Sequence, residues 1–229
     1  MWLLNSSVGK KVIMSVSGVA LVLFLLFHMS MNLVAIFSGE AYNAICEFLG
    51  ANWYALVATA GLAALVIVHF VYAIILTLQN KKARGDQAYA YTAKPKGVEW
   101  ASQNMFVLGV IVILGMGLHL YNFWANMQLV EIMHMMGAHV DATYAADGVY
   151  HIQQTFSCPV YTVLYLVWLV ALWFHLTHGF WSALQTLGWN NQVWFNRWRC
   201  IGNVVATLIV AGFAAVAIIF ALYPCAGAC

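Results

Sequence analysis

Five long apolar runs, separated by shorter polar segments, dominate the pattern of residues along the chain. They cover residues 12–37, 53–78, 102–127, 160–187 and 201–223. A membrane-spanning helix needs about 20 apolar residues, because each residue advances the helix by about 1.5 Å across roughly 30 Å of hydrocarbon. The pattern therefore predicts an all-α integral membrane bundle of five transmembrane helices, in one domain over residues 1–229. The first run is too long for the apolar part of a signal peptide, so we expect it to remain as the first span.

The composition agrees with a membrane protein. Hydrophobic residues make up 64% of the 229 residues and charged residues only 7%, whereas charged residues are about a quarter of a soluble domain. The formal net charge is only +2. We therefore expect a lipid membrane, and no nucleic acid, as the surroundings of this chain.

The few charged residues predict the orientation of the bundle. All nine basic residues lie before the first run, between the second and third, or between the fourth and fifth: Lys10, Lys11, Lys81, Lys82, Arg84, Lys94, Lys96, Arg197 and Arg199. The other loops hold acidic residues and no Lys or Arg: Glu40, Glu47, Glu131, Asp141 and Asp147. Because basic loops stay in the cytoplasm, we expect a cytoplasmic N-terminus and a periplasmic C-terminus, across a bacterial cytoplasmic (inner) membrane.

Four of the apolar runs carry a histidine deep within them: His28, His69, His119 and His175. An ionisable group in a membrane segment is costly, so it usually faces the bundle interior or a cofactor. Each of these histidines lies 15 to 17 residues after the start of its run, and the direction of the helices alternates. We therefore expect His28 with His119 toward the outer face, and His69 with His175 toward the cytoplasmic face.

Two imidazoles that face each other from different helices suit an iron porphyrin with both axial positions filled, which favours electron transfer. The two levels would lie roughly 10–15 Å apart along the membrane normal. A hydrogen bond between helices is the simplest alternative for any one histidine. Transport of zinc or copper is a weaker alternative, because such sites use carboxylates, thiols or several ligands at one depth. His178 lies about 300° around the helix from His175, so only one of the two is expected to face the partner helix.

Small residues beside the histidines leave two interpretations open. Ser15, Ser17 and Gly18 lie near the inner end of the first run, where they would admit either another helix or a flat ligand. Gly115 and Gly117 bare the helix backbone beside His119. That exposure would help a wide planar group to approach the imidazole.

The outer loops offer weaker candidates. Residues 38–52 have an amphipathic pattern that predicts a short interfacial helix. A zinc or copper site is conceivable in residues 128–159, from His134, His139, His151, Asp141 and Asp147. Their irregular spacing favours a folded, solvent-facing loop instead. Cys158, Cys225 and Cys229 also fall on the outer side, where they would be either disulfide-bonded or small, half-buried residues.

Five segments taken together carry a resemblance to a known family. They are KKVIMSVSGVALVLFLLFHMSMNL, SGEAYNAICEFL, VHFVYA, GMGLHLY and FHLTHGFWSALQTLGW, in this order along the chain. In their order and spacing the chain resembles the di-haem cytochrome b membrane-anchor subunit of the succinate dehydrogenase and fumarate reductase (succinate:quinone oxidoreductase) family. The resemblance is to the form with one polypeptide and five helices, and it covers nearly the whole length.

The resemblance implies two haem b groups as cofactors. His28 and His119 would be the axial ligands of the distal, outer haem iron, and His69 and His175 those of the proximal, inner haem iron. The family ligand in the fourth span stands four residues before a glycine, which selects His175, with Gly179, over His178. Ser15 and Ser17 would be candidate contacts for the propionates of the proximal haem.

The resemblance also implies the partners and the reaction. A flavoprotein subunit and an iron–sulfur subunit would dock on the cytoplasmic side, and the complex is expected as a heterotrimer or a dimer of heterotrimers. Electrons from succinate would pass to a quinone, by expectation menaquinone, in the respiratory chain, or in reverse to fumarate. The chain would serve the enzyme as its electron-transfer subunit, with no dicarboxylate chemistry of its own.

The chain departs from the family at two positions. A fumarate-reducing branch has a glutamate where this chain has Trp173, and a glutamate of the quinol site where this chain has Gly50. Glu47 and Glu40 are nearby alternatives for the quinone site, or else ordinary interfacial acids. Two other classes remain open: the cytochrome b subunit of a hydrogenase or formate dehydrogenase, and a non-redox membrane protein with structural histidines.

Overall fold

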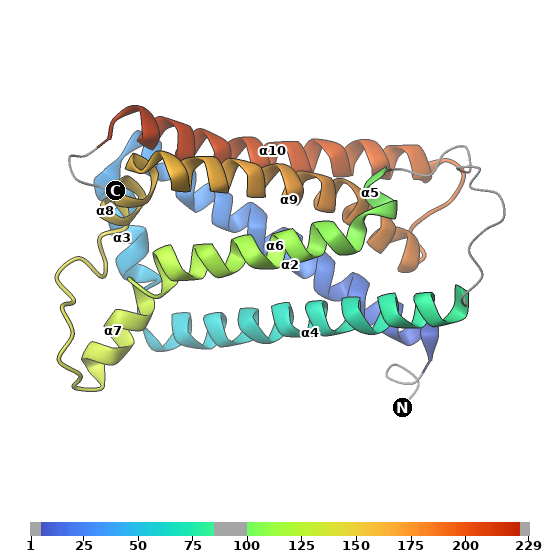
Figure 1. The fold of residues 1–229 in the computed structure, drawn as a ribbon, viewed down its shortest axis with the longest axis horizontal. Coiled ribbons are helices and arrows are strands. Elements are labelled where there is room, and N and C mark those ends of the chain that lie inside the picture. The colour runs from blue at the N-terminus through green and yellow to red at the C-terminus, as the bar shows by residue number, and fades with distance from the viewer. Residues whose placement is uncertain (1–5, 85–99, 225–229) are drawn as a thin grey trace.

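The computed structural model describes residues 6–84 and 100–224, and within these two stretches all regular secondary structure is helical. Five helices are long and apolar enough to cross a membrane. They are α2 (Ser7–Phe37), α4 (Trp53–Arg84), α6 (Met105–His119) with its π-helical continuation η1 (Leu120–Trp124), α9 (Pro159–Thr186) and α10 (Trp194–Leu222). The five predicted spans are thus confirmed as helices, and Figure 1 shows them side by side in an elongated bundle.

Helix α9 lies at the centre of the packing. It contacts α10, α2 and α6, whereas α4 packs mainly against α2. The core between α2, α9 and α10 includes Val22, Leu172 and the fully buried Ile209. Figure 1 shows α4 and α10 along opposite sides of the bundle. Helix α4 therefore forms an edge, and none of the residues in its most apolar stretch is buried.

Short helices close the two ends of the bundle. Helices α3 (Gly39–Phe48), α7 (Gln128–Met135) and α8 (Gly148–Ser157) gather at one end, and α5 (Trp100–Gln103) lies at the other. Helix α3 confirms the helix predicted in residues 38–52. The predicted outer loop over residues 128–159 contains α7 and α8, so it is folded as expected.

The helix ends differ from the predicted spans where polar residues continue the helix. Helix α2 begins five residues early, because the Ser6 hydroxyl accepts the Gly9 N–H at 2.9 Å and caps it. Helix α4 extends to Arg84, since lysine and arginine are favoured at a helix C-terminus by the helix dipole. The third predicted span is not one helix: α6 starts at Met105, and the backbone changes to a π-helix at Leu120.

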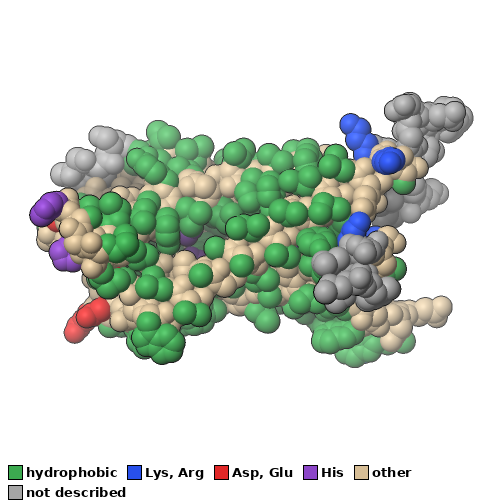
Figure 2. Space-filling view, turned by 90° about the horizontal axis from the view of Figure 1, so that it is seen from below, with side chains coloured by type: hydrophobic (Ala, Val, Ile, Leu, Met, Phe, Trp, Pro, Cys, Tyr) green, Lys and Arg blue, Asp and Glu red, His purple; other side chains and the backbone are tan. Residues whose placement is uncertain are grey.

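Charged side chains lie at the two ends of the bundle. Figure 2 shows Lys and Arg at one end, and acidic side chains with histidines at the other. This separation agrees with the charge pattern of the sequence, although Lys94 and Lys96 lie outside the described residues. The assignment of the basic end to the cytoplasm stays a prediction. We use "inner end" for the basic end and "outer end" for the end with α3, α7 and α8.

Candidate cofactor-binding site

The structure brings His28 of α2 and His119 of α6 together near the outer end. Their ring centres are 5.8 Å apart, with an angle of 80° between the ring planes. Phe24, one turn before His28, stacks on the His28 ring at 5.4 Å, and Phe213 of α10 contacts it at 5.5 Å. The pair is therefore enclosed by aromatic side chains from two helices. We call His28 and His119 the outer pair.

The backbone changes its helical form directly after His119. His119 is the last residue of α6, and the π-helical turn that follows adds a residue to the helix. This turn also places Asn122 inside the bundle, where its amide donates to the Tyr165 hydroxyl at 3.3 Å. Trp168 of α9 lies 6.0 Å from the His119 ring. Single π-helical turns inside α-helices occur frequently at functional sites.

His69 of α4 and His175 of α9 form a second pair nearer the inner end. Their ring centres are 6.4 Å apart, with an angle of 67° between the planes. Two glycines lie close to these rings. A Cβ on Gly18 would lie 3.3 Å from His69 Cε1, and one on Gly109 would lie 3.8 Å from His175 Cε1. We call His69 and His175 the inner pair.

The two pairs lie at different depths. The Ser17 hydroxyl contacts His69, and His28 follows Ser17 by eleven residues on α2. Gly109 lies against His175, and His119 follows it by ten residues on α6. At about 1.5 Å per residue, the levels are about 15 Å apart along α6 and about 16.5 Å apart along α2. This is slightly more than the roughly 10–15 Å expected from the sequence.

The ring-centre distances of the two pairs, 5.8 Å and 6.4 Å, are close to that of two imidazoles sharing one metal ion. A metal–imidazole bond is about 2.0 Å long and the ring centre lies about 1.1 Å beyond the nitrogen, so opposed ligands have centres about 6.2 Å apart. Among the residues that the structure describes, no three His, Cys, Asp or Glu side chains form a metal site. A metal held by either pair would therefore need its other ligands from a cofactor, and an iron porphyrin brings four of its own.

Other residues singled out in the sequence lie at varied distances from the two pairs. Ser15 and Ser17 are buried, and Ser17 contacts His69, so the propionate role of both stays a prediction. His178 lies 5.0 Å from the Trp181 ring. The expectation that Gly115 leaves bare backbone for a planar group is wrong. The Trp168 ring fills that space, and its Nε1 donates to the Val112 carbonyl at 3.0 Å.

A pocket of about 750 Å³ opens at the outer end between α3, the start of α4, and α7. Glu47, a predicted quinone residue, lines it together with Tyr54 and His134, whereas Glu40 is not among its lining residues. Glu131 also lines this pocket, although it was not among the quinone residues predicted from the sequence. Its carboxylate accepts the Ala51 N–H at 2.6 Å. Gly50 makes this contact possible, since a Cβ there would lie 2.5 Å from Glu131 Oε2.

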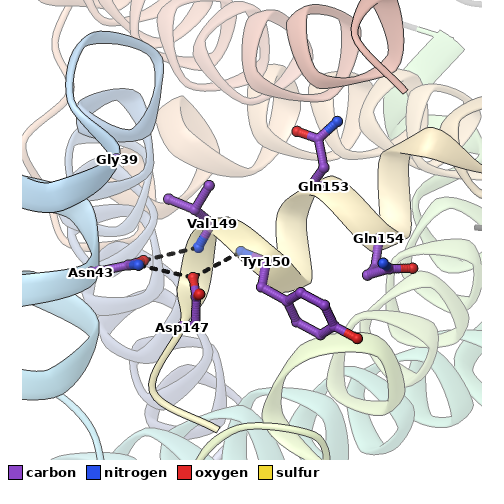
Figure 3. Close-up of a pocket in the computed structure, with 7 residues that line it drawn as sticks. All are labelled: Gly39, Asn43, Asp147, Val149, Tyr150, Gln153 and Gln154. Carbon is purple, nitrogen blue, oxygen red and sulfur yellow. Dashed lines mark hydrogen bonds between the residues drawn. The ribbon is translucent and has the colours of Figure 1, made fainter. Parts of the chain in front are cut away.

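A smaller pocket of about 380 Å³ lies between α3 and α8, and Figure 3 shows the contacts that join these helices there. The Asn43 amide donates to Asp147 at 2.8 Å and accepts the Val149 N–H at 3.0 Å. Asp147 also caps α8 by accepting the Tyr150 N–H. These hydrogen bonds join α3 to the start of α8 at the outer end.

The outer loop does not assemble the zinc or copper site considered above. His134 lines the larger pocket, and His151 bonds the Tyr144 carbonyl at 3.0 Å. Burial lowers the pKa of His151, so its neutral form is favoured. No metal cluster forms from these histidines and Asp141 and Asp147 within the described part of the chain.

The cysteines of the outer end are in two states. Cys158 is disulfide-bonded, and its partner lies outside the described residues, as do Cys225 and Cys229. Cys46 is free, and burial raises the pKa of its thiol to about 11.

Hydrogen bonds also connect α3 to α2 near the outer pair. The Tyr42 hydroxyl of α3 donates to Asn32 at 3.1 Å, and the Asn32 amide donates to the His28 carbonyl at 2.8 Å. Helix α3 is thereby tied to the segment of α2 that carries His28.

The fold and the site define a class, a multi-pass helical membrane protein with two histidine pairs between its spans. In comparisons with known proteins, no family model, no curated protein and no solved structure matches this sequence. The functional argument below is therefore built on the residues and their geometry.

Proposed function

We propose that this chain is the di-haem b membrane-anchor subunit of a succinate:quinone oxidoreductase. It would carry electrons between a cytoplasmic flavoprotein and iron–sulfur pair and membrane menaquinone. The observation that carries the proposal is the meeting of four histidines as two pairs, each drawn from different helices and separated in depth. Structural hydrogen bonding between helices would not require two separate imidazole pairs with this spacing.

The residues of both pairs fit an axially ligated haem. The ring-centre distances of 5.8 Å and 6.4 Å bracket the separation of about 6.2 Å expected for opposed imidazole ligands. His28 and His119 would hold the outer haem, and His69 and His175 the inner haem. His175 Nδ1 is buried without a hydrogen-bond partner, so no hydrogen bond between helices accounts for this nitrogen. Bound haem would supply one-electron chemistry at each level.

The packing of α4 also supports a cofactor inside the bundle. This helix carries His69, yet it packs mainly against α2 and buries none of the residues in its most apolar stretch. A flat porphyrin between α4 and α9 would cover the inward side of α4. Gly18 and Gly109, which lie against the two rings of the inner pair, would keep the approach to them open.

We place the quinone in the outer pocket, lined by Glu47, Glu131 and His134. Reduction of a quinone to a quinol takes up two electrons and two protons. The outer pair lies at the same end of the bundle, and carboxylates and an imidazole at a water-facing pocket can exchange protons with solvent. Glu40, which does not line this pocket, is the weaker of the two quinone residues suggested by the sequence.

The inner end suits the partner subunits. Lys81, Lys82, Arg197 and Arg199 lie at this end, which is also the end nearer the inner pair. The flavoprotein and iron–sulfur subunits would dock there, and the dicarboxylate chemistry would reside on them.

The test is a reduced-minus-oxidised absorption spectrum of the purified chain and of membranes that contain its complex. We expect haem b bands from two haems per chain, which succinate reduces and which hydrogen and formate do not reduce. Reduction by hydrogen or formate in place of succinate would assign the chain to another respiratory enzyme. A spectrum without haem b bands would favour a non-redox membrane protein.

A further inference from the structure

Ser17 makes a polar contact with the inner pair. Its side chain is only 2% exposed, and it lies on α2 next to Gly18, which accommodates the His69 ring. The Ser17 hydroxyl oxygen is 3.0 Å from His69 Nδ1, on another helix. The same hydroxyl is 3.0 Å from the Met14 carbonyl, to which it donates. A buried hydroxyl thus joins a backbone carbonyl to an imidazole nitrogen.

The protons available at this contact favour one tautomer of His69. A serine hydroxyl has one proton to donate and two lone pairs that accept. With that proton donated to the Met14 carbonyl, the Ser17 oxygen is free to accept from His69, which favours the tautomer with the ring proton on Nδ1. A neutral imidazole has a single N–H. In this tautomer Nε2 of His69 carries the lone pair that a metal requires.

His175 and His28 differ from His69 in this respect. His175 Nδ1 is buried with no hydrogen-bond partner. For His28, the nearest polar side-chain group is the Asn32 amide, whose nitrogen is 3.4 Å from Nδ1 and is a donor, not an acceptor. The contact with Ser17 thus distinguishes His69 from both His175 and His28.

We propose that Ser17 is a positioning residue for the inner haem, which it serves through His69. This inference rests on the proposed function. An acceptor on Nδ1–H holds the ring in one tautomer and orientation and makes the imidazole a stronger ligand. A stronger axial ligand stabilises ferric over ferrous iron, so Ser17 lowers the midpoint potential of the inner haem. This role differs from a propionate contact, because the Ser17 proton is given to Met14.

The test is a redox titration of the haem absorbance in Ser17→Ala. We expect the midpoint potential of one haem to rise and that of the other to stay unchanged. A threefold change in the ratio of ferrous to ferric inner haem corresponds to about 28 mV for one electron. Ser17→Thr keeps the hydroxyl and should restore the wild-type potential. Ser30→Ala is the matched control, since Ser30 lies on the same helix and bonds only the Leu26 carbonyl.

The inference is overturned if both potentials in Ser17→Ala equal those of wild type, or if only the haem lost in His28→Ala shifts. If Ser17→Ala loses the inner haem and Ser17→Thr retains it, the role of the hydroxyl is upheld. If Ser17→Ala loses both haems, the midpoint potentials are measured in Ser17→Cys instead. Its sulfur is only a weak acceptor, so the midpoint potential of the inner haem should rise there too, and an unchanged potential would overturn the inference. Failure of the proposed function is a separate result, the absence of haem in the wild type.

Discussion

Glu131 is the residue that joins the outer pocket to the turn between α3 and α4. Its carboxylate accepts the Ala51 N–H, while Gln128, one turn earlier in α7, donates to the Gly50 carbonyl at 2.9 Å. Two side chains of α7 thus hold one turn of the backbone. The carboxylate of Glu131 is half-buried there, at the wall of the pocket that Glu47 also lines.

Glu131→Gln should slow quinone reduction. The amide oxygen can still accept the Ala51 N–H, so the turn should stay in place, but the side chain can no longer exchange a proton. General acid–base groups contribute about 10²-fold or more to rate. We therefore expect at least a tenfold lower rate of reduction of a soluble menaquinone analogue, with haem content unchanged.

Asp141→Asn serves as the control for this experiment. Asp141 is an exposed acid of the same outer loop, whose pKa is lowered by hydrogen bonds from Thr143, and it does not line the pocket. We expect its substitution to leave the rate unchanged. A wild-type rate in Glu131→Gln would remove Glu131 from the quinone site.

Single residues differ in how far the sequence reveals them. The four histidines could be predicted because an imidazole is conspicuous in an apolar run and its depth can be counted. Ser17 and Glu131 could not be assigned their contacts, because their partners are 52 and 80 residues away in the chain. A hydrogen bond between helices leaves no periodic signal in the sequence.

Among the elements, α6 depends most on a single close contact. The Trp168 side chain of α9 packs against α6 at Gly115, and a Cβ on Gly115 would overlap the indole ring. Gly115 lies one turn before His119, so the indole also packs beside the outer pair. The position of α6 against α9 is therefore set by a large residue fitted to a small one.

Gly115→Ala should destabilise the protein and disturb the outer pair. Overpacking of this kind typically costs 1–3 kcal/mol, and displacement of Trp168 removes its contact with His119. We expect a lower unfolding temperature in detergent and a changed midpoint potential of the outer haem alone.

Gly117→Ala is the matched substitution on the same helix. Gly117 precedes His119 by two residues, so it lies on the opposite face of α6, and a Cβ there would meet nothing within 4 Å. Alanine is also the better helix former, so stability should be equal or higher. Equal losses in both variants would contradict the role given to Trp168.

The elements themselves were largely predictable, and their irregularities were not. Five runs of apolar residues gave five helices because hydrocarbon requires every backbone polar group to be bonded within the segment. The π-helical turn at Leu120 is defined by a backbone hydrogen bond between residues five apart, from the Ala125 N–H to the Leu120 carbonyl, and hydropathy does not report this spacing. The helical extension to Arg84 was likewise hidden, because a polar tail can continue a helix in water.

At the scale of the whole molecule, the charges and the histidine pairs define two ends. The described Lys and Arg side chains lie at the inner end, and the described acids at the outer end (Figure 2). With basic loops retained in the cytoplasm, the inner pair would face the soluble partners and the outer pair the quinone pocket. Both the orientation and the electron path depend on this assignment.

The two free thiols in the described part of the chain provide a test of orientation. Cys200 is exposed near the inner end, and Cys46 lies at the outer end. A membrane-impermeant maleimide at pH 7.5 should label Cys200 in inverted vesicles and not in right-side-out vesicles. In right-side-out vesicles Cys46 should label slowly, because its pKa of about 11 leaves little reactive thiolate, and in inverted vesicles the reagent should not reach it. Labelling of Cys200 in right-side-out vesicles would show that the orientation is opposite to the one predicted.

The measurement that tests the central claim most directly is a redox titration of the haem b absorbance in wild type, His28→Ala and His69→Ala. Two one-electron components are predicted for the wild type. His28→Ala should abolish or grossly perturb one of them and His69→Ala the other. Loss of the same component in both variants, loss of neither, or a wild type without haem b bands would contradict the two-level account.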